Sequence, residues 1–238
     1  MQKQRLDKFI SNQLNISRKD VRTALKRGQA TVNGRIEKDA AFTVDTDADV
    51  IIFEGKEISY KKYIYILMNK PKGVLSASND KSRETVVDLV PAELKRAGLF
   101  PVGRLDRDTT GLLIITDNGE FAHNCISPKK MISKSYIASL DGEVTEEMCE
   151  IFGQGVTLKD GTKCKPAKLY PLDSNKARII ITEGKYHQIK RMFGTVGLGV
   201  NELHRESIGG LALPQSLEEG KCIEIAEKEA FSALLKVC

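Results

Sequence analysis

Apolar residues near the start of the chain follow the spacing of two short helices. Those of the first helix are Leu6, Phe9, Ile10 and Leu14. Their spacing of three or four residues places them on one side of a helix, so this side should be buried. Ser17, followed three residues later by Asp20, has the pattern of a capping box, which predicts that a second helix begins after Ser17. Its expected buried positions are Val21, Ala24 and Leu25.

A small hairpin is expected behind the two helices. Gly28 stands where a glycine commonly ends a helix, and Ala30–Val32 then has a strand-like composition. Residues 33–34 (Asn-Gly) strongly indicate a tight turn between strands, and Val50–Phe53 can return as a strand. The polar residues 55–62 (GKEISYKK) have the composition of a linker.

After this linker the pattern changes to buried strands mixed with helices. The strands expected there are Tyr63–Met68, Leu112–Thr116, Tyr136–Leu140 and Arg178–Thr182. Apolar residues between 189 and 196 have helical spacing, and Ala226–Val237 has the composition of a closing helix. The mixture predicts an α+β domain with more strand than helix. We therefore expect a helix–helix–hairpin module at 1–57, a linker at 58–62 and a larger domain at 63–238.

The composition is that of an ordinary soluble globular protein, with 41% hydrophobic and 29% charged residues. No apolar run approaches the length that spans a membrane, and the first residues lack the apolar stretch of a signal peptide. We therefore expect a cytoplasmic protein without a membrane partner. The five widely spaced cysteines contain no CxxC pair, which argues against a disulfide framework or a metal site. Because no coiled-coil pattern is present, we expect a monomer.

Positive charge is concentrated at the start of the chain. Residues 1–35 carry nine Lys or Arg against two acidic residues, whereas residues 36–57 carry two Lys against seven acidic residues. A local excess of this kind favours a phosphate-binding face on the first segment, although a solvated charged surface is the alternative. The candidate RNA-binding residues are Arg5, Arg18, Lys19, Arg22, Lys26 and Arg27.

One stretch of the larger domain combines charges that could carry chemistry. Residues 103–113 (GRLDRDTTGLL) place two arginines and two aspartates in a turn-rich segment directly before a buried strand. A carboxylate between arginines should stay ionised, and an ionised carboxylate can act as a nucleophile or general base. A purely structural salt-bridge turn would have the same composition.

Residues 2–57 resemble the alpha-L RNA-binding module, the type found in ribosomal small-subunit protein four. The resemblance is carried by Arg5–Ile10 (RLDKFI), by Ser17-Arg18 and by Gly28–Gly34 (GQATVNG). It implies that the helix pair binds structured RNA.

The larger domain resembles the pseudouridine synthases of the RsuA type. The main string is GRLDRDTTGLLIITDNGEFAH, which starts at Gly103. Four further stretches agree in order, namely 66–74 (ILMNKPKGV), 134–136 (KSY), 183–192 (EGKYHQIKRM) and 203–210 (LHRESIGG). The resemblance implies a mixed, mainly antiparallel sheet and a catalytic domain over residues 63–238.

The same resemblance implies roles for particular residues. Asp106 matches the essential catalytic aspartate, and Tyr136 matches a tyrosine that lies against the target base. Lys190 matches the basic residue that pairs with this aspartate, with Arg191 as the alternative partner. Arg104 would fill the space left by a flipped nucleotide.

The resemblance assigns no catalytic role to two other residues of the matched stretches. Asp108 follows Asp106 by two positions and is interpreted as structural, and His187 is assigned no part in catalysis.

The reaction that the resemblance implies is isomerisation of a uridine in small-subunit (16S) ribosomal RNA to pseudouridine, on naked rRNA or on a small subunit during assembly. It is redox-neutral and should need no cofactor. One alternative is the same chemistry on large-subunit rRNA or tRNA. Another is a non-catalytic RNA-binding or ribosome-assembly protein, which would leave the motifs of the larger domain unexplained.

Overall fold

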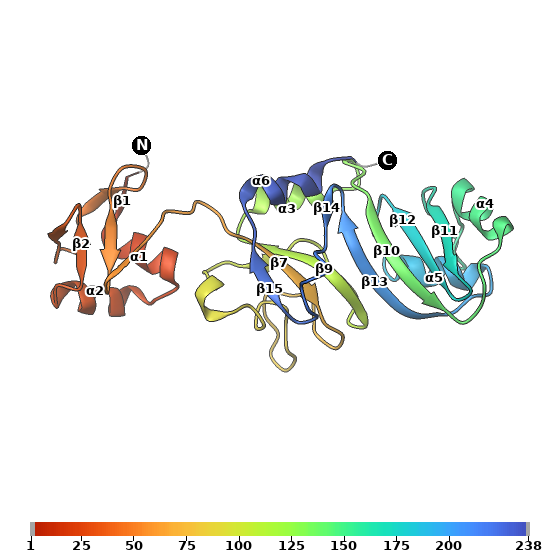
Figure 1. Cartoon of the computed structure of the whole chain (residues 1–238), viewed down its shortest axis with the longest axis horizontal. Helices are drawn as coiled ribbons and strands as arrows, with labels where there is room; N and C mark the ends of the chain where they lie inside the picture. The colour runs from red at the N-terminus through yellow and green to blue at the C-terminus, as the bar shows by residue number, and fades with distance from the viewer. Residues whose placement is uncertain (1–2, 237–238) are drawn as a thin grey trace. The chain divides into compact units, whose positions relative to one another are not determined.

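The computed structural model describes residues 3–236, which cluster into two units (Figure 1). The first unit ends at Ile64 and also takes in Pro91–Leu99, and the second contains Tyr65–Val90 and the chain from Phe100 onward. No helix among these residues is both long and apolar enough to cross a membrane.

The first unit contains two helices and a small antiparallel sheet. Its elements are β1 (Lys3–Arg5), α1 (Leu6–Leu14), α2 (Arg18–Lys26), β2 (Ala30–Val32), β3 (Arg35–Ile36), β4 (Thr43–Asp45), β5 (Ile51–Phe53), β6 (Lys56–Glu57) and the 3-10 helix η1 (Ala92–Leu94). The main sheet has the order β3-β2-β5-β6, and β1 pairs with β4. The apolar stripes of α1 and α2 lie in one core with β2 and β5. Leu14, expected on the buried side of α1, is instead exposed at the end of that helix.

Several local predictions for this unit are confirmed. The Ser17 side chain caps α2 by accepting a hydrogen bond from the Asp20 amide. Asn33 and Gly34 both have positive φ, as the tight turn between β2 and β3 requires. The segment expected to be a linker contributes more than predicted, because Ile58 is buried in the core of this unit.

The second unit is built on one large sheet. Its strands are β7 (Tyr65–Lys70), β8 (Phe100–Pro101), β9 (Thr109–Thr116), β10 (Lys134–Leu140), β11 (Lys168–Asp173), β12 (Lys176–Ile181), β13 (Val200–Ile208), β14 (Leu211–Ala212) and β15 (Cys222–Glu224). Its helices are α3 (Gly119–Ile126), α4 (Glu146–Gln154), α5 (Gln188–Thr195), α6 (Glu227–Phe231) and the 3-10 helix η2 (Ser232–Leu234).

The sheet has the order β11-β12-β10-β13-β9-β7-β15, with β14 added to β13 and β8 added to β9. Every neighbouring pair is antiparallel except β13 and β9, which are parallel. All residues of β7 and β9 are buried, and α3 and α6 cover this end of the sheet (Figure 1). The predicted α+β class with a mixed, mainly antiparallel sheet is confirmed.

The prediction for the closing helix is wrong in its length, since α6 ends at Phe231 and continues only as η2. Val237, at the end of the expected helix, lies outside the described residues.

The parallel pairing of β9 with β13 depends on Gly111. This residue has φ +102°, and a Cβ built on it would lie 2.3 Å from the backbone oxygen of Arg205. Since Arg205 is its register partner on β13, only a residue without a side chain lets the two backbones approach this closely. The close approach brings residues 103–108, which precede β9, next to the sequence around Arg205.

We expect Gly111→Ala to lower the free energy of unfolding of the second unit by roughly 2 to 4 kcal/mol, because it adds a backbone clash to an unfavourable φ. Gly220→Ala is the matched control, since Gly220 has φ +83° but nothing within 4 Å of a built Cβ. Hydrogen exchange of β9 and β13 peptides measures the loss locally. Equal losses in the two variants would contradict the clash.

Candidate active site

Asp106 lies on the loop between β8 and β9, and this loop is held in place by the segment that follows β7. The Ser76 hydroxyl donates to the Leu105 carbonyl at 2.9 Å and accepts from the Leu105 amide at 3.1 Å. The Gly73 amide donates to the Arg107 carbonyl at 2.8 Å. The residues on either side of Asp106 are therefore fixed to one neighbouring segment.

Lys70, at the end of β7, is fully buried beneath the same loop. Its Nζ donates to the carbonyl oxygens of Pro71, Arg107 and Thr109 at 2.8, 3.4 and 3.1 Å. Burial lowers the pKa of Lys70 to about 8, because the charged form loses its hydration. This one ammonium group thus connects β7, the Asp106 loop and the start of β9.

A pocket of about 90 Å³ opens beside Asp106. Arg104, Asp106, Tyr136 and Lys190 all line it, so the structure brings together the four residues predicted for the reaction centre. Tyr136 is buried on β10, whereas the Asp106 side chain is 30% exposed and can meet a ligand. An accessible carboxylate and a buried aromatic ring therefore line the same pocket.

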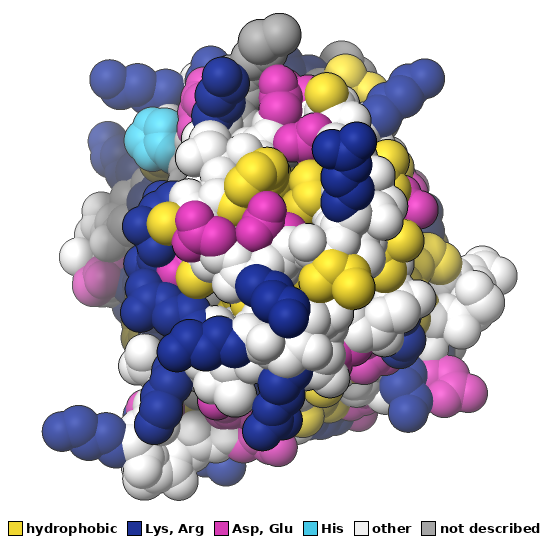
Figure 2. Space-filling view, turned by 90° about the vertical axis from the view of Figure 1, so that its left-hand side faces the viewer, with side chains coloured by type: hydrophobic (Ala, Val, Ile, Leu, Met, Phe, Trp, Pro, Cys, Tyr) yellow, Lys and Arg dark blue, Asp and Glu magenta, His cyan; other side chains and the backbone are white. Residues whose placement is uncertain are grey.

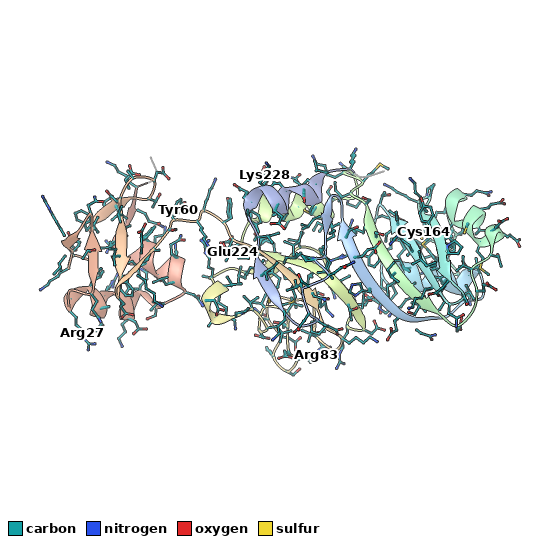
Figure 3. All side chains as sticks on the ribbon, in the orientation of Figure 1. Arg27, Tyr60, Arg83, Cys164, Glu224 and Lys228 are labelled. Atoms are coloured by element: carbon teal, nitrogen blue, oxygen red, sulfur yellow. The ribbon has the colours of Figure 1, made fainter. Side chains whose placement is uncertain are left out.

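The pocket adjoins a wider groove of about 950 Å³, which is within the size range of ligand sites. Its cationic lining residues are Arg83, Arg104, Arg107, Lys134, Lys185 and Arg205. Asp80 and Asp106 are the two acidic residues of the same lining. Arg83 extends from the loops after β7 (Figure 3). The excess of positive charge makes the groove attractive to a polyanion.

The predicted ion pair between Asp106 and Lys190 or Arg191 is not what the structure contains. Lys190 Nζ instead pairs with Asp108 Oδ2, and Arg191 Nη2 pairs with Asp160 Oδ2. Asp108 is the more exposed of the two loop carboxylates, so the flexible lysine side chain meets it at the rim. The hydrogen bond from Lys190 lowers the pKa of Asp108.

His187 and Arg205 belong to the site although sequence reasoning gave them no role. His187 Nε2 lies 3.6 Å from Asp106 Oδ1. Arg205 is buried, donates from Nε to the Leu112 carbonyl at 2.7 Å and from Nη1 to the Tyr136 hydroxyl at 3.4 Å. Both residues lie within the motif stretches. Their contacts with Asp106, Leu112 and Tyr136 depend on the order of the strands in the sheet, which the sequence motifs do not reveal.

A second cationic cluster lies on the first unit, around a buried aspartate. Asp7 is fully buried and accepts from Arg5, Arg18 and Arg22 at 3.2, 2.7 and 3.0 Å, while each arginine side chain stays about half exposed. Burial alone would raise the pKa of Asp7, but the hydrogen bonds from the three arginines hold it well below its usual range. Asp7 therefore fixes three of the predicted RNA-binding arginines.

The remaining predicted RNA-binding residues, Lys19, Lys26 and Arg27, are exposed on or just after α2. Figure 2 shows Lys and Arg side chains gathered along the left side and the lower edge of the face that it draws.

Comparison with known proteins gives matches over both units. A family model described as RNA pseudouridylate synthase matches residues 64–195, and an S4 domain model matches residues 4–51. The chain is 38% identical over 236 residues to Ribosomal small subunit pseudouridine synthase A of Escherichia coli (strain K12), covering 97% of this chain and 100% of the relative.

Two further relatives agree with these matches. The uncharacterized RNA pseudouridine synthase YtzG of Bacillus subtilis (strain 168) is 40% identical over 229 residues, covering 94% of this chain and 96% of that protein. A crystal structure of a pseudouridylate synthase superimposes with a TM-score of 0.67 at 34% identity, covering 96% of this chain and 99% of the other.

We expect the buried ammonium of Lys70 to make stability depend on pH in a defined direction. An unfolded lysine titrates near 10.4, whereas the pKa of Lys70 is about 8. Between these values the unfolded chain binds more protons, so this residue makes the free energy of unfolding rise as pH increases. Urea unfolding of wild type and Lys70→Met from pH 7 to 10 should give a difference that shifts steadily in favour of wild type.

Lys72→Met is the control for this series, because it removes an exposed lysine whose pKa is raised by Glu202 and which titrates above this range. A wild-type-minus-Lys70→Met difference that stays flat from pH 7 to 10 would show that Lys70 is not held in a desolvated site.

Proposed function

Because the chain belongs to the RNA pseudouridylate synthase family and carries an S4 domain, we propose that it converts a uridine of small-subunit (16S) ribosomal RNA to pseudouridine, with Asp106 as the nucleophile. The observation that carries the assignment of Asp106 is the pocket that its carboxylate shares with Tyr136 beside a cationic groove. An RNA strand fits the charge of the groove, and one base fits the smaller pocket.

The target uridine must leave its stack before it can reach this pocket. Flipping a nucleotide costs a few kcal/mol, which contacts to the extruded base and backbone must offset. The buried ring of Tyr136 offers an aromatic surface against the uracil. Arg104 is exposed at the pocket entrance, where its planar guanidinium can occupy the place that the nucleotide leaves.

The chemistry then takes place at ribose C1′. The bond from C1′ to uracil N1 breaks, the base turns within the pocket and C1′ joins uracil C5. The proton on C5 is lost, and N1 gains one. The Asp106 carboxylate acts at C1′, either by forming a covalent adduct or by taking a proton during elimination, and both routes place it beside the same ribose. The reaction is an isomerisation, so it requires no oxidant, reductant or added group.

The surrounding cations suit this role of Asp106. Lys190 lines the pocket but its ammonium is bound to Asp108, so Asp106 feels a nearby positive charge without being blocked by a direct ion pair. The Asp106 carboxylate therefore remains available to the ribose, while Lys190 lines the pocket beside it.

The choice of 16S rRNA as substrate is supported by the full-length similarity to the Escherichia coli enzyme named for the ribosomal small subunit. The arginines around Asp7 add phosphate contacts, which fix an RNA in position but read little sequence. Large-subunit rRNA and tRNA are the competing substrates, since YtzG, at comparable identity, has no stated substrate.

The experiment that tests this proposal compares three RNAs labelled with tritium at uridine C5, because pseudouridine formation releases that tritium. Wild-type protein should release tritium stoichiometrically from small-subunit rRNA, either free or partly assembled with ribosomal proteins. Large-subunit rRNA and bulk tRNA at the same uridine concentration should give release at background. Release from either of those RNAs and none from small-subunit rRNA would overturn the choice of substrate while leaving the family chemistry in place.

A further inference from the structure

Tyr186 is the most exposed large hydrophobic side chain of the described residues, with 76% of its surface accessible. It lies in the short segment between β12 and α5, and it lines the cationic groove. Among residues 3–236 no group hydrogen-bonds its hydroxyl. An aromatic ring that is neither packed in a core nor held by its hydroxyl offers a free apolar face to whatever enters the groove.

The ring of Tyr186 is backed on one side by His187. The two rings are stacked, with centroids 3.9 Å apart and planes inclined by 16°. His187 holds its ring there from a left-handed backbone conformation, φ +48°, which is unfavourable for a residue with a side chain. The stack therefore leaves only the opposite face of Tyr186 open.

The backbone beneath this pair is fixed by a buried carboxylate. Glu183 accepts from Lys185 Nζ at 2.6 Å, from Gln188 Nε2 at 2.9 Å and from the Lys165 amide at 3.0 Å. These bonds tie the segment that carries Tyr186 to α5 and to the chain before β11. The exposed ring is thus presented from an ordered segment, which lowers the entropy that binding would otherwise cost.

The position of the stack connects it to the reaction centre. His187 Nε2 is 3.6 Å from Asp106 Oδ1, and the ring of the same histidine stacks on Tyr186 in the groove lining. A flipped uridine leaves its neighbours without one stacking partner, and these bases pass through the groove with it. An unpaired base and a rigid aromatic face therefore meet near the same place.

We propose that Tyr186 is a stacking platform for an unpaired base next to the target uridine, with His187 closing the other face of the ring. The proposal rests on the proposed function, because it takes the groove to hold an RNA strand. Stacking of this kind tolerates any base, so the platform strengthens binding without choosing sequence. Its expected contribution is about 5- to 150-fold in RNA affinity.

The test uses Tyr186→Ala and Tyr186→Phe in the full chain, with Tyr170→Ala as the matched control. Tyr170 is an exposed tyrosine on β11 and does not line the groove. Two quantities are measured for each protein. One is the Kd for a 16S transcript without C5 tritium, measured by filter binding. The other is the tritium-release kinetics on whichever of the three tritium-labelled RNAs the wild type converts.

Tyr186→Ala should raise both Kd and the half-saturating RNA concentration by about 5- to 150-fold, with little change in kcat. Tyr186→Phe keeps the ring and should stay near wild type, as should Tyr170→Ala. The proposal is overturned if Tyr186→Ala behaves like Tyr170→Ala, or if Tyr186→Phe loses as much as Tyr186→Ala. It is also overturned if kcat falls while Kd is unchanged, because the ring would then only position His187.

A second measurement locates the stacked base once the converted uridine has been mapped. Short RNA hairpins carry an abasic nucleotide immediately before or after that uridine. For one of these abasic hairpins, the Kd with wild type should equal the Kd of the intact hairpin with Tyr186→Ala. The Kd of the same abasic hairpin should rise no further when Tyr186→Ala replaces wild type. Additive losses at both positions would contradict the platform. The Kd comparison is repeated on each of the three RNAs, so a loss of affinity by Tyr186→Ala on the converted RNA supports the platform whichever RNA that is. The choice of substrate can then fail without the platform failing.

Discussion

The ammonium group of Lys70 has three hydrogens, and in this structure its three hydrogen bonds all go to backbone carbonyl oxygens of the segments that surround Asp106. Burying that charge without a paired carboxylate costs free energy, and the same loss of hydration lowers the pKa of Lys70. The three carbonyls compensate only if the loop keeps one conformation. The buried charge of Lys70 therefore holds the turn-rich segment around Asp106 in one conformation. The pairing of β9 with β13 at Gly111 places this segment beside β13.

In the N-terminal unit the buried charged group is a carboxylate, and the exposed groups that it holds in place are cations. Three half-exposed arginines, one on β1 and two on α2, would repel one another, but the buried carboxylate of Asp7 on α1 holds them together. Net positive charge still remains for phosphates, because one carboxylate neutralises only one of the three. In each unit one desolvated charged side chain thus holds exposed charged groups in place. Lys70 holds the loop that carries the Asp106 carboxylate, and Asp7 holds the arginine cluster of the first unit.

Short sequence patterns correctly predicted the helix start and the turn that depend only on residues next to each other in the chain. The capping box at Ser17 and the turn at residues 33–34 have the predicted structure, since both depend on neighbouring residues. The motif strings also predicted that Asp106 and Tyr136 share a pocket. The partner of Lys190 could not be predicted, because two aspartates stand two residues apart and only the fold decides which one it reaches. The contacts of Arg205 likewise depend on a parallel strand pair that no local pattern indicates.

The most direct test of the account is tritium release and RNA binding by Asp106→Asn beside Asp108→Asn, on the RNA that wild type converts. The two variants remove the same charge from the same loop. Asp106→Asn should lose at least about a thousandfold in rate while its Kd for RNA stays near that of wild type. Asp108→Asn should lose no more than about tenfold, because it only frees Lys190. A loss in Asp106→Asn well below about a thousandfold, or an equal loss in both variants, would contradict the role of Asp106 as the nucleophile.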